Sequence, residues 1–156
     1  MVAIGGWTGS QYFSANVNSD NRAAFVKAVV DFATQYNVDG IDFDWEYPGT
    51  QGIGCNEVSN DDTTNFLAFL QALRQDPVGK ELILTVDTPL QIWNGESGAV
   101  MTDVSGFASA LDWMFLMNYE VWGSWYVTFV VLYTYSTVPN LFLILQGTRG
   151  RTQRTS

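Results

Sequence analysis

Three carboxylates at alternate positions, those of Asp42, Asp44 and Glu46, form the part of the sequence best suited to chemistry. Successive side chains of a β-strand point to opposite faces, so in a strand these three carboxylates would share one face. No Lys or Arg lies between them to offset the repulsion of like charges. The positions on the opposite face are apolar: Ile41, Phe43 and Trp45. We therefore interpret the acidic row as a functional face and not as an ordinary solvated edge.

The repulsion within this row is large enough to retain a proton. Carboxylates at alternate strand positions lie roughly 7 Å apart. At an effective dielectric constant of about 20, each ionised pair costs roughly 2.4 kcal/mol, which raises a pKa by about 1.7. We expect the row to hold a proton at neutral pH unless a cation neutralises it, and a retained proton is what a general acid needs. The pattern leaves two kinds of site open: a carboxylate acid catalyst, or an oxygen-ligand site for a hard cation.

The segments around the row alternate between strands and helices, which predicts an α/β fold with a parallel sheet. The residues that could do chemistry follow the C-terminal ends of the expected strands, where a (β/α)₈ barrel keeps its active site. The segment 10–18 is polar and is expected to be a loop. The expected order is a strand over 1–6, a helix from Ser19 or Asp20 to Tyr36, the acidic strand, a helix capped by Asn60 or Asp61 and stopped by Pro77, a strand over 82–86, a short helix near 104–111 and a strand over 112–119.

The composition bounds the class of protein. The chain has 156 residues, of which 47% are hydrophobic, enough for one globular core, and we expect a monomer if it folds. Its net charge of −9 argues against nucleic acid and anionic membranes as partners. The chain has no histidine, which excludes a Ser-His-Asp triad and histidine-ligated zinc. We expect no metal and no cofactor.

The motif Asp39-x-x-Asp42-x-Asp44-x-Glu46 resembles the signature of glycoside hydrolase family 18, the chitinases, and its wording is closest to secreted fungal-type members. The segment 3–7, Ala-Ile-Gly-Gly-Trp, resembles the third strand of that family's barrel, and the segment 117–119, Met-Asn-Tyr, resembles the sixth. The resemblance covers roughly residues 1–125. It implies a partial (β/α)₈ barrel, about strands 3 to 6, because a complete barrel usually needs about 250 residues.

The resemblance also implies a reaction: hydrolysis of β-1,4-linked N-acetylglucosamine in chitin or chito-oligosaccharides, with the substrate's own acetamido group as nucleophile. Glu46 would be the general acid and then the general base. Asp44 would orient the acetamido group and stabilise the positive intermediate, and Asp42 would share a proton with Asp44. Tyr119 would donate its hydroxyl to the acetamido carbonyl. The same resemblance places these residues in the substrate-binding site: Trp7, Tyr47, Met117, Asn118 and Glu120.

One residue departs from the family pattern, which usually has Asp after the sixth-strand tyrosine, whereas this chain has Glu120. The extra methylene displaces the carboxylate by more than a preorganised site tolerates, so we expect reduced turnover even on a complete barrel.

The segment 126–156 differs from everything before it, because it is apolar and uncharged up to residue 148 and then basic, with Arg149, Arg151 and Arg154. By length and charge it could be a tail anchor, but Pro139 and several hydroxyl residues weaken that interpretation. We favour translated non-coding or frame-shifted sequence, because the resemblance stops near Trp125. We therefore divide the chain into a partial catalytic domain over 1–125 and an aberrant tail over 126–156.

Three functions remain open: a chitinase fragment with low or no activity of its own, a non-catalytic carbohydrate-binding relative, and a truncated product without function. The resemblance implies an extracellular protein, although the first residues show no signal-peptide pattern. We expect the chain to be a fragment of a longer catalytic domain.

Overall fold

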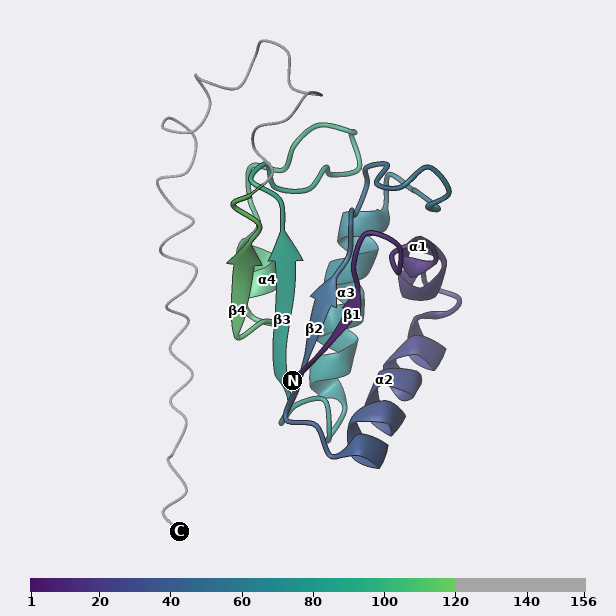
Figure 1. Cartoon of the computed structure of the whole chain (residues 1–156), viewed down its shortest axis with the longest axis vertical. Helices are drawn as coiled ribbons and strands as arrows, with labels where there is room; N and C mark the ends of the chain where they lie inside the picture. The colour runs from purple at the N-terminus through teal and green to yellow at the C-terminus, as the bar shows by residue number, and fades with distance from the viewer. Residues whose placement is uncertain (120–156) are drawn as a thin grey trace.

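The computed structural model describes residues 1–119, and four parallel strands there form one sheet (Figure 1). The strands are β1 (Val2–Gly5), β2 (Gly40–Asp44), β3 (Ile83–Thr88) and β4 (Trp113–Leu116), and they lie in the sheet in the order of the sequence. Because every neighbouring pair is parallel, the C-terminal ends of all four strands meet at one edge of the sheet. The predicted α/β architecture is confirmed.

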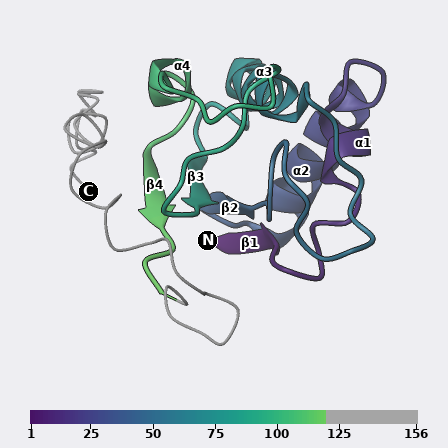
Figure 2. The ribbon, with the colours of Figure 1, turned by 90° about the horizontal axis from the view of Figure 1, so that it is seen from above.

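Four helices connect the strands and lie on one side of the sheet (Figure 2). They are α1 (Phe13–Val17), α2 (Arg22–Tyr36), α3 (Asp62–Gln75) and α4 (Ser105–Ala108). Helix α3 packs against each of the other three. Within residues 1–119, the opposite side of the sheet has no helical cover.

The core lies between the sheet and these helices. The residues of β2 and β3 that face the helices are fully buried, which is why the strands read as apolar at alternate positions. These residues are Ile41, Phe43, Leu84 and Val86. Aromatic side chains fill the space beneath them: Phe66 of α3 meets Phe43, Trp45 and Trp93 at ring-centroid distances between 5.3 and 6.2 Å. The predicted apolar face of the acidic strand is therefore confirmed as core.

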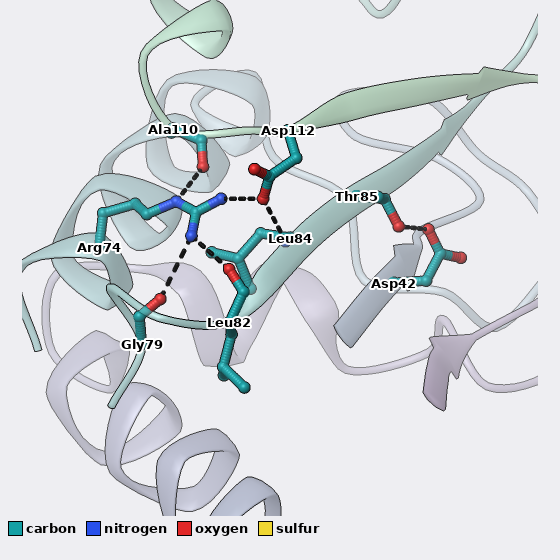
Figure 3. Close-up of polar contacts among 8 residues, drawn as sticks. All are labelled: Asp42, Arg74, Gly79, Leu82, Leu84, Thr85, Ala110 and Asp112. Carbon is teal, nitrogen blue, oxygen red and sulfur yellow. Dashed lines mark hydrogen bonds and ion pairs between the residues drawn. The ribbon is translucent and has the colours of Figure 1, made fainter. Parts of the chain in front are cut away.

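A buried ion pair ties α3 to the beginnings of β3 and β4 (Figure 3). Arg74 lies 2.6 Å from Asp112, and its guanidinium also donates to the backbone oxygens of Ala110 and Leu82, each at 2.6 Å. The same Asp112 oxygen accepts the backbone N–H of Leu84 at 2.9 Å. This network helps to hold the alignment of β3 and β4 from the end opposite the candidate site.

The beginning of α2 differs from the sequence prediction. The segment 10–18 is not all loop, because it contains the five-residue helix α1. Neither Ser19 nor Asp20 caps α2; instead, the Asn18 side chain accepts the backbone N–H groups of Asp20 and Asn21, each at 3.0 Å, so the helix begins at Arg22.

Two further predictions are corrected. Helix α3 begins with Asp61 at its N-cap position, but no side chain of Asn60 or Asp61 caps it. Strand β3 continues past Val86 to Thr88, because its ladder with β4 extends that far. The longer strand carries Asp87 to the candidate site.

Candidate active site

The acidic row lies on the face of β2 that turns away from the helices. Its neighbours on that face are Ala3 of β1 and Thr85 of β3, both of which pair with Asp42. The Thr85 hydroxyl donates a hydrogen bond to Oδ1 of Asp42, whose side chain is only 8% exposed (Figure 3). The sheet thus presents Asp42 and Asp44 on one face, as the alternation predicted.

Asp44 has an environment that favours its protonated form. Burial, followed by the charges of Glu46 and Asp42, raises the pKa of Asp44 to about 6. Its Oδ1 atom is buried and has no hydrogen-bond partner within residues 1–119. A buried carboxyl oxygen without a partner costs free energy, so a donor group of a ligand at this position would relieve that cost.

A fourth carboxylate, that of Asp87, joins the row from β3 and was not identified from the sequence. Its pKa is raised to about 7, first by burial and then by the charges of Asp42 and Asp44, by a side-chain hydrogen bond with Asp42 and by the charge of Glu46. The available signal was the pair Thr85 and Asp87, two polar residues at alternate positions that follow the apolar run of β3. The predicted strand ended at Val86 and so excluded it.

Glu46 follows the end of β2, and its backbone is held on both sides. The fully buried hydroxyl of Ser10 accepts the backbone N–H of Glu46 at 2.9 Å. The Asn56 side-chain amide donates to the backbone oxygen of Glu46 at 2.9 Å. Ser10 and Asn56 come from two different loops, and neither was singled out from the sequence. The backbone of Glu46 is thus held through its N–H by Ser10 and through its carbonyl oxygen by Asn56.

The glycine pair at the end of β1 allows the two strand ends to approach each other. Gly5 has φ +119°, and a Cβ atom there would lie 2.1 Å from the backbone oxygen of Asp44. The backbone N–H of Gly6 donates to that same oxygen at 2.8 Å. Glycine, which has no Cβ atom, is the residue type that allows this close approach at a positive φ.

Asp62, at the start of α3, anchors the loop that follows Glu46. It is fully buried and accepts hydrogen bonds from the Ser14 hydroxyl at 2.5 Å and from the backbone N–H groups of Ser59 and Gly49 at 2.9 and 3.2 Å. Burial raises the pKa of Asp62, although these hydrogen bonds act in the opposite direction. The carboxylate thus links α1, α3 and the loop near the site.

The remaining predicted site residues lie at the same edge of the sheet. Trp7 is 49% exposed, and its ring meets that of Tyr47 edge to face at 6.5 Å. Met117, Asn118 and Tyr119 directly follow β4, and the backbone N–H of Met117 donates to the oxygen of Thr88 at 2.8 Å. Glu120 and the predicted tail over 126–156 lie outside the described residues. The domain division remains a prediction.

One finding bears on the alternative of a cation site, whereas the tail considered as a membrane anchor lies outside the described residues. In the described part of the chain, no group of three or more Cys, Asp or Glu side chains is arranged to hold a metal ion. None of the helices formed by residues 1–119 combines the length and the apolar character that a membrane span requires.

The comparisons with known proteins agree with this geometry. The sequence model of glycosyl hydrolases family 18 matches residues 1–137. A "chitinase-like effector" of Moniliophthora roreri is 49% identical over 124 residues, which are 79% of this chain and 30% of that protein. A solved chitinase from Rhizomucor miehei superposes with a TM-score of 0.73 at 38% identity, over 78% of this chain and 33% of its own.

A third relative was solved with a carbohydrate bound. A mutant of the Group II chitinase catalytic domain 2 of Ostrinia furnacalis, in complex with penta-N-acetylchitooctaose, superposes with a TM-score of 0.65 at 28% identity, over 79% of this chain and 32% of its own. The chain therefore spans about a third of the length of each of these three relatives.

Proposed function

Because the chain belongs to family 18 of the glycosyl hydrolases, we propose that it carries the acid site of a chitinase, which hydrolyses β-1,4-linked N-acetylglucosamine. Its four parallel strands correspond to part of the family's barrel. The chain covers about a third of the length of these two relatives, so we propose that its activity alone is low but measurable.

The observation that carries this proposal is the placement of the acid row at the carboxyl ends of parallel strands. That edge is where barrels of this type build their active sites. Asp42 and Asp44 share the face away from the core, and Glu46 follows at the strand's mouth with its backbone held by Ser10 and Asn56. Fixed backbone contacts of this kind preorganise a reacting carboxyl group.

In the proposed mechanism Glu46 protonates the glycosidic oxygen, and the substrate's acetamido oxygen attacks the anomeric carbon as the glycosidic bond breaks. Asp44 orients the acetamido group with its partnerless buried oxygen and stabilises the positive charge that develops. Glu46 then removes a proton from the water that opens the cyclic intermediate, so the anomeric configuration is retained. Tyr119 donates its hydroxyl to the acetamido group.

The proposed substrate surface is formed by the residues around this edge. Trp7 and Tyr47 present aromatic rings next to the glycine pair, and aromatic faces suit the apolar faces of sugar rings. Met117, Asn118 and Glu120 complete the proposed contacts from the sixth strand of the barrel. We propose an extracellular protein whose partner is chitin or a chito-oligosaccharide.

A second candidate function is chitin binding without cleavage. The observation that favours it is that a relative with 49% identity, from Moniliophthora roreri, is described as a "chitinase-like effector" and not as a chitinase. Under this candidate the carboxylates and aromatic side chains would hold a chito-oligosaccharide without turning it over.

Cleavage of a fluorogenic chitobioside and retention on chitin beads separate these candidates. The variants are Glu46→Gln, which keeps the shape but cannot transfer the proton, and the control Glu57→Gln, which alters an exposed carboxylate in the loop that follows. Cleavage that is lost in Glu46→Gln and kept in Glu57→Gln supports the hydrolase. Cleavage that survives Glu46→Gln refutes the acid assignment. Retention without cleavage in the native chain supports the binding function.

A further inference from the structure

Asp87 supplies a carboxylate to the acid site from a strand that carries no part of the acidic motif. It lies on β3, one position after Val86, which pairs with Phe43 of β2. Asp87 therefore lies beside the position of Asp44 in the neighbouring strand. Because neighbouring strand positions in register point to the same face, Asp87 faces the same side as the acid row.

The surroundings of Asp42 show what Asp87 contacts. The Asp42 carboxylate accepts a hydrogen bond from the Thr85 hydroxyl and is hydrogen-bonded to the Asp87 side chain (Figure 3 shows the Thr85 contact). Two carboxyl groups can share a hydrogen bond only when one of them carries the proton. Asp42 thus lies between a hydroxyl donor and a carboxyl group on the same neighbouring strand.

We propose that Asp87 is a positioning residue of the acid site, which holds a proton and donates it in a hydrogen bond to the carboxyl group of Asp42. This inference deepens the proposed function and rests on it. Thr85 and Asp87 then both donate to Asp42, and Asp44 stays outside this set of hydrogen bonds. Under this proposal the proton that the family resemblance implied for Asp42 and Asp44 lies between Asp42 and Asp87, and the partnerless Oδ1 atom of Asp44 stays free to accept a donor from the acetamido group.

The charges around Asp87 support a retained proton. The groups that act on it are Asp42, Asp44 and Glu46, all of them acidic, and together with burial they raise its pKa to about 7. The ion pairs of residues 1–119 are Lys27–Asp31 and Arg74–Asp112, and neither includes a member of this cluster. The local field therefore opposes ionisation of Asp87 below neutral pH.

The test is a titration of the side-chain carboxyl carbons of the full chain by NMR, with Asp87→Asn identifying the Asp87 signal. We expect the Asp87 carboxyl to titrate near neutral pH. In Asp42→Asn, its midpoint falls by about one pH unit or more, because Asn carries no charge and is a weaker acceptor than a carboxylate. The control is Asp39→Asn, which should leave the midpoint unchanged. Asp39 is exposed, lies just before β2 and, by the strand alternation, does not belong to the face of the acid row. A merely structural role for Asp87 would not link its titration to Asp42.

Two results would overturn the inference: an Asp87 carboxyl that titrates near pH 4, or a midpoint that stays the same in Asp42→Asn. Chito-oligosaccharide binding, measured on the same samples, tests the proposed function separately. If the Asp87 midpoint falls in Asp42→Asn but the chain neither binds nor cleaves chito-oligosaccharides, the proposed function is refuted. The inference that a proton lies between Asp42 and Asp87 then still stands. If the Asp87 midpoint stays the same in Asp42→Asn and the chain cleaves chitin, only the role of Asp87 is refuted.

Discussion

Replacing Ser10 with alanine tests whether the loop after β1 fixes the position of Glu46. Ser10 is fully buried, and its hydroxyl donates to the backbone oxygen of Gly6 at 2.8 Å while accepting the backbone N–H of Glu46 at 2.9 Å. No other side chain joins the end of β1 to the start of the loop that carries Glu46 in this way among the hydrogen bonds of residues 1–119. The substitution removes this link without adding bulk.

The expected magnitude follows from which groups lose their partners. The Gly6 oxygen still accepts the N–H of Gly9 at 3.1 Å, and the Asp44 oxygen still accepts the N–H of Gly6 at 2.8 Å. Only the backbone N–H of Glu46 loses the partner that it has here. An unsatisfied, partly buried donor costs about 1–3 kcal/mol, so we expect Ser10→Ala to lower the free energy of unfolding by about 2 kcal/mol.

Urea unfolding measures this loss, and amide hydrogen exchange locates it. We expect the Glu46 amide to exchange faster in Ser10→Ala while core amides of β2 change only with global stability. The control is Ser19→Ala, an exposed serine whose 3.3 Å hydrogen bond to Asp20 is a surface contact, and its effect should stay within about 0.5 kcal/mol. Equal stability of Ser10→Ala and the native chain, with unchanged Glu46 exchange, would refute the positioning argument.

Three further predictions concern other parts of the structure and are measured by urea unfolding, two of them against a control substitution. Gly5→Ala places a Cβ atom 2.1 Å from a backbone oxygen at φ +119° and should cost at least about 2 kcal/mol, whereas Gly54→Ala enters open space and should stay within about 0.5 kcal/mol; equal effects would contradict this. Arg74→Met removes the charge partner of the largely buried Asp112 carboxylate and should cost about 3–5 kcal/mol. The control Lys27→Met breaks an exposed ion pair and should lower the free energy of unfolding by less than about 1 kcal/mol. A similar loss in Arg74→Met and Lys27→Met would contradict the expected effect of burial. The pKa of Asp44 is raised from 3.8 to about 6, so its protonated form stabilises the fold most below pH 3.8 and this contribution is lost as the pH rises through 6. Stability should fall between pH 4 and 7, less steeply in Asp44→Asn, and an unchanged slope in that variant would contradict the shift.

The acidic motif shows what local periodicity can predict. The alternation along residues 41–46 predicted which side chains are core and which form the acid row, and the burial of Ile41, Phe43 and Trp45 confirms the apolar face. The order of strands and helices followed from the same kind of local pattern. Short-range features such as the start of α2 were less predictable, because the Asn18 side chain forms a turn before the helix.

The contacts that organise the candidate site were beyond such patterns. Ser10 and Glu46 are 36 positions apart, and Thr85 and Asp42 are 43 positions apart. Which residue of one strand meets which residue of another depends on the register of the parallel sheet, and that register is set by how the helices and the core pack together. Asp87 therefore lay outside the predicted strand, and only the pairing of β3 with β2 brings it beside the acid row.

The sequence by itself determined the family, the alternation of strands and helices, and the carboxylates that share one face, because each of these depends on residue type and short spacing. The tertiary structure alone decided that Asp87 joins those carboxylates and that Ser10 and Asn56 hold Glu46. The physical reason is that the pKa of a carboxyl group and the position of a loop depend on neighbours in space, and folding brings those neighbours from distant parts of the chain.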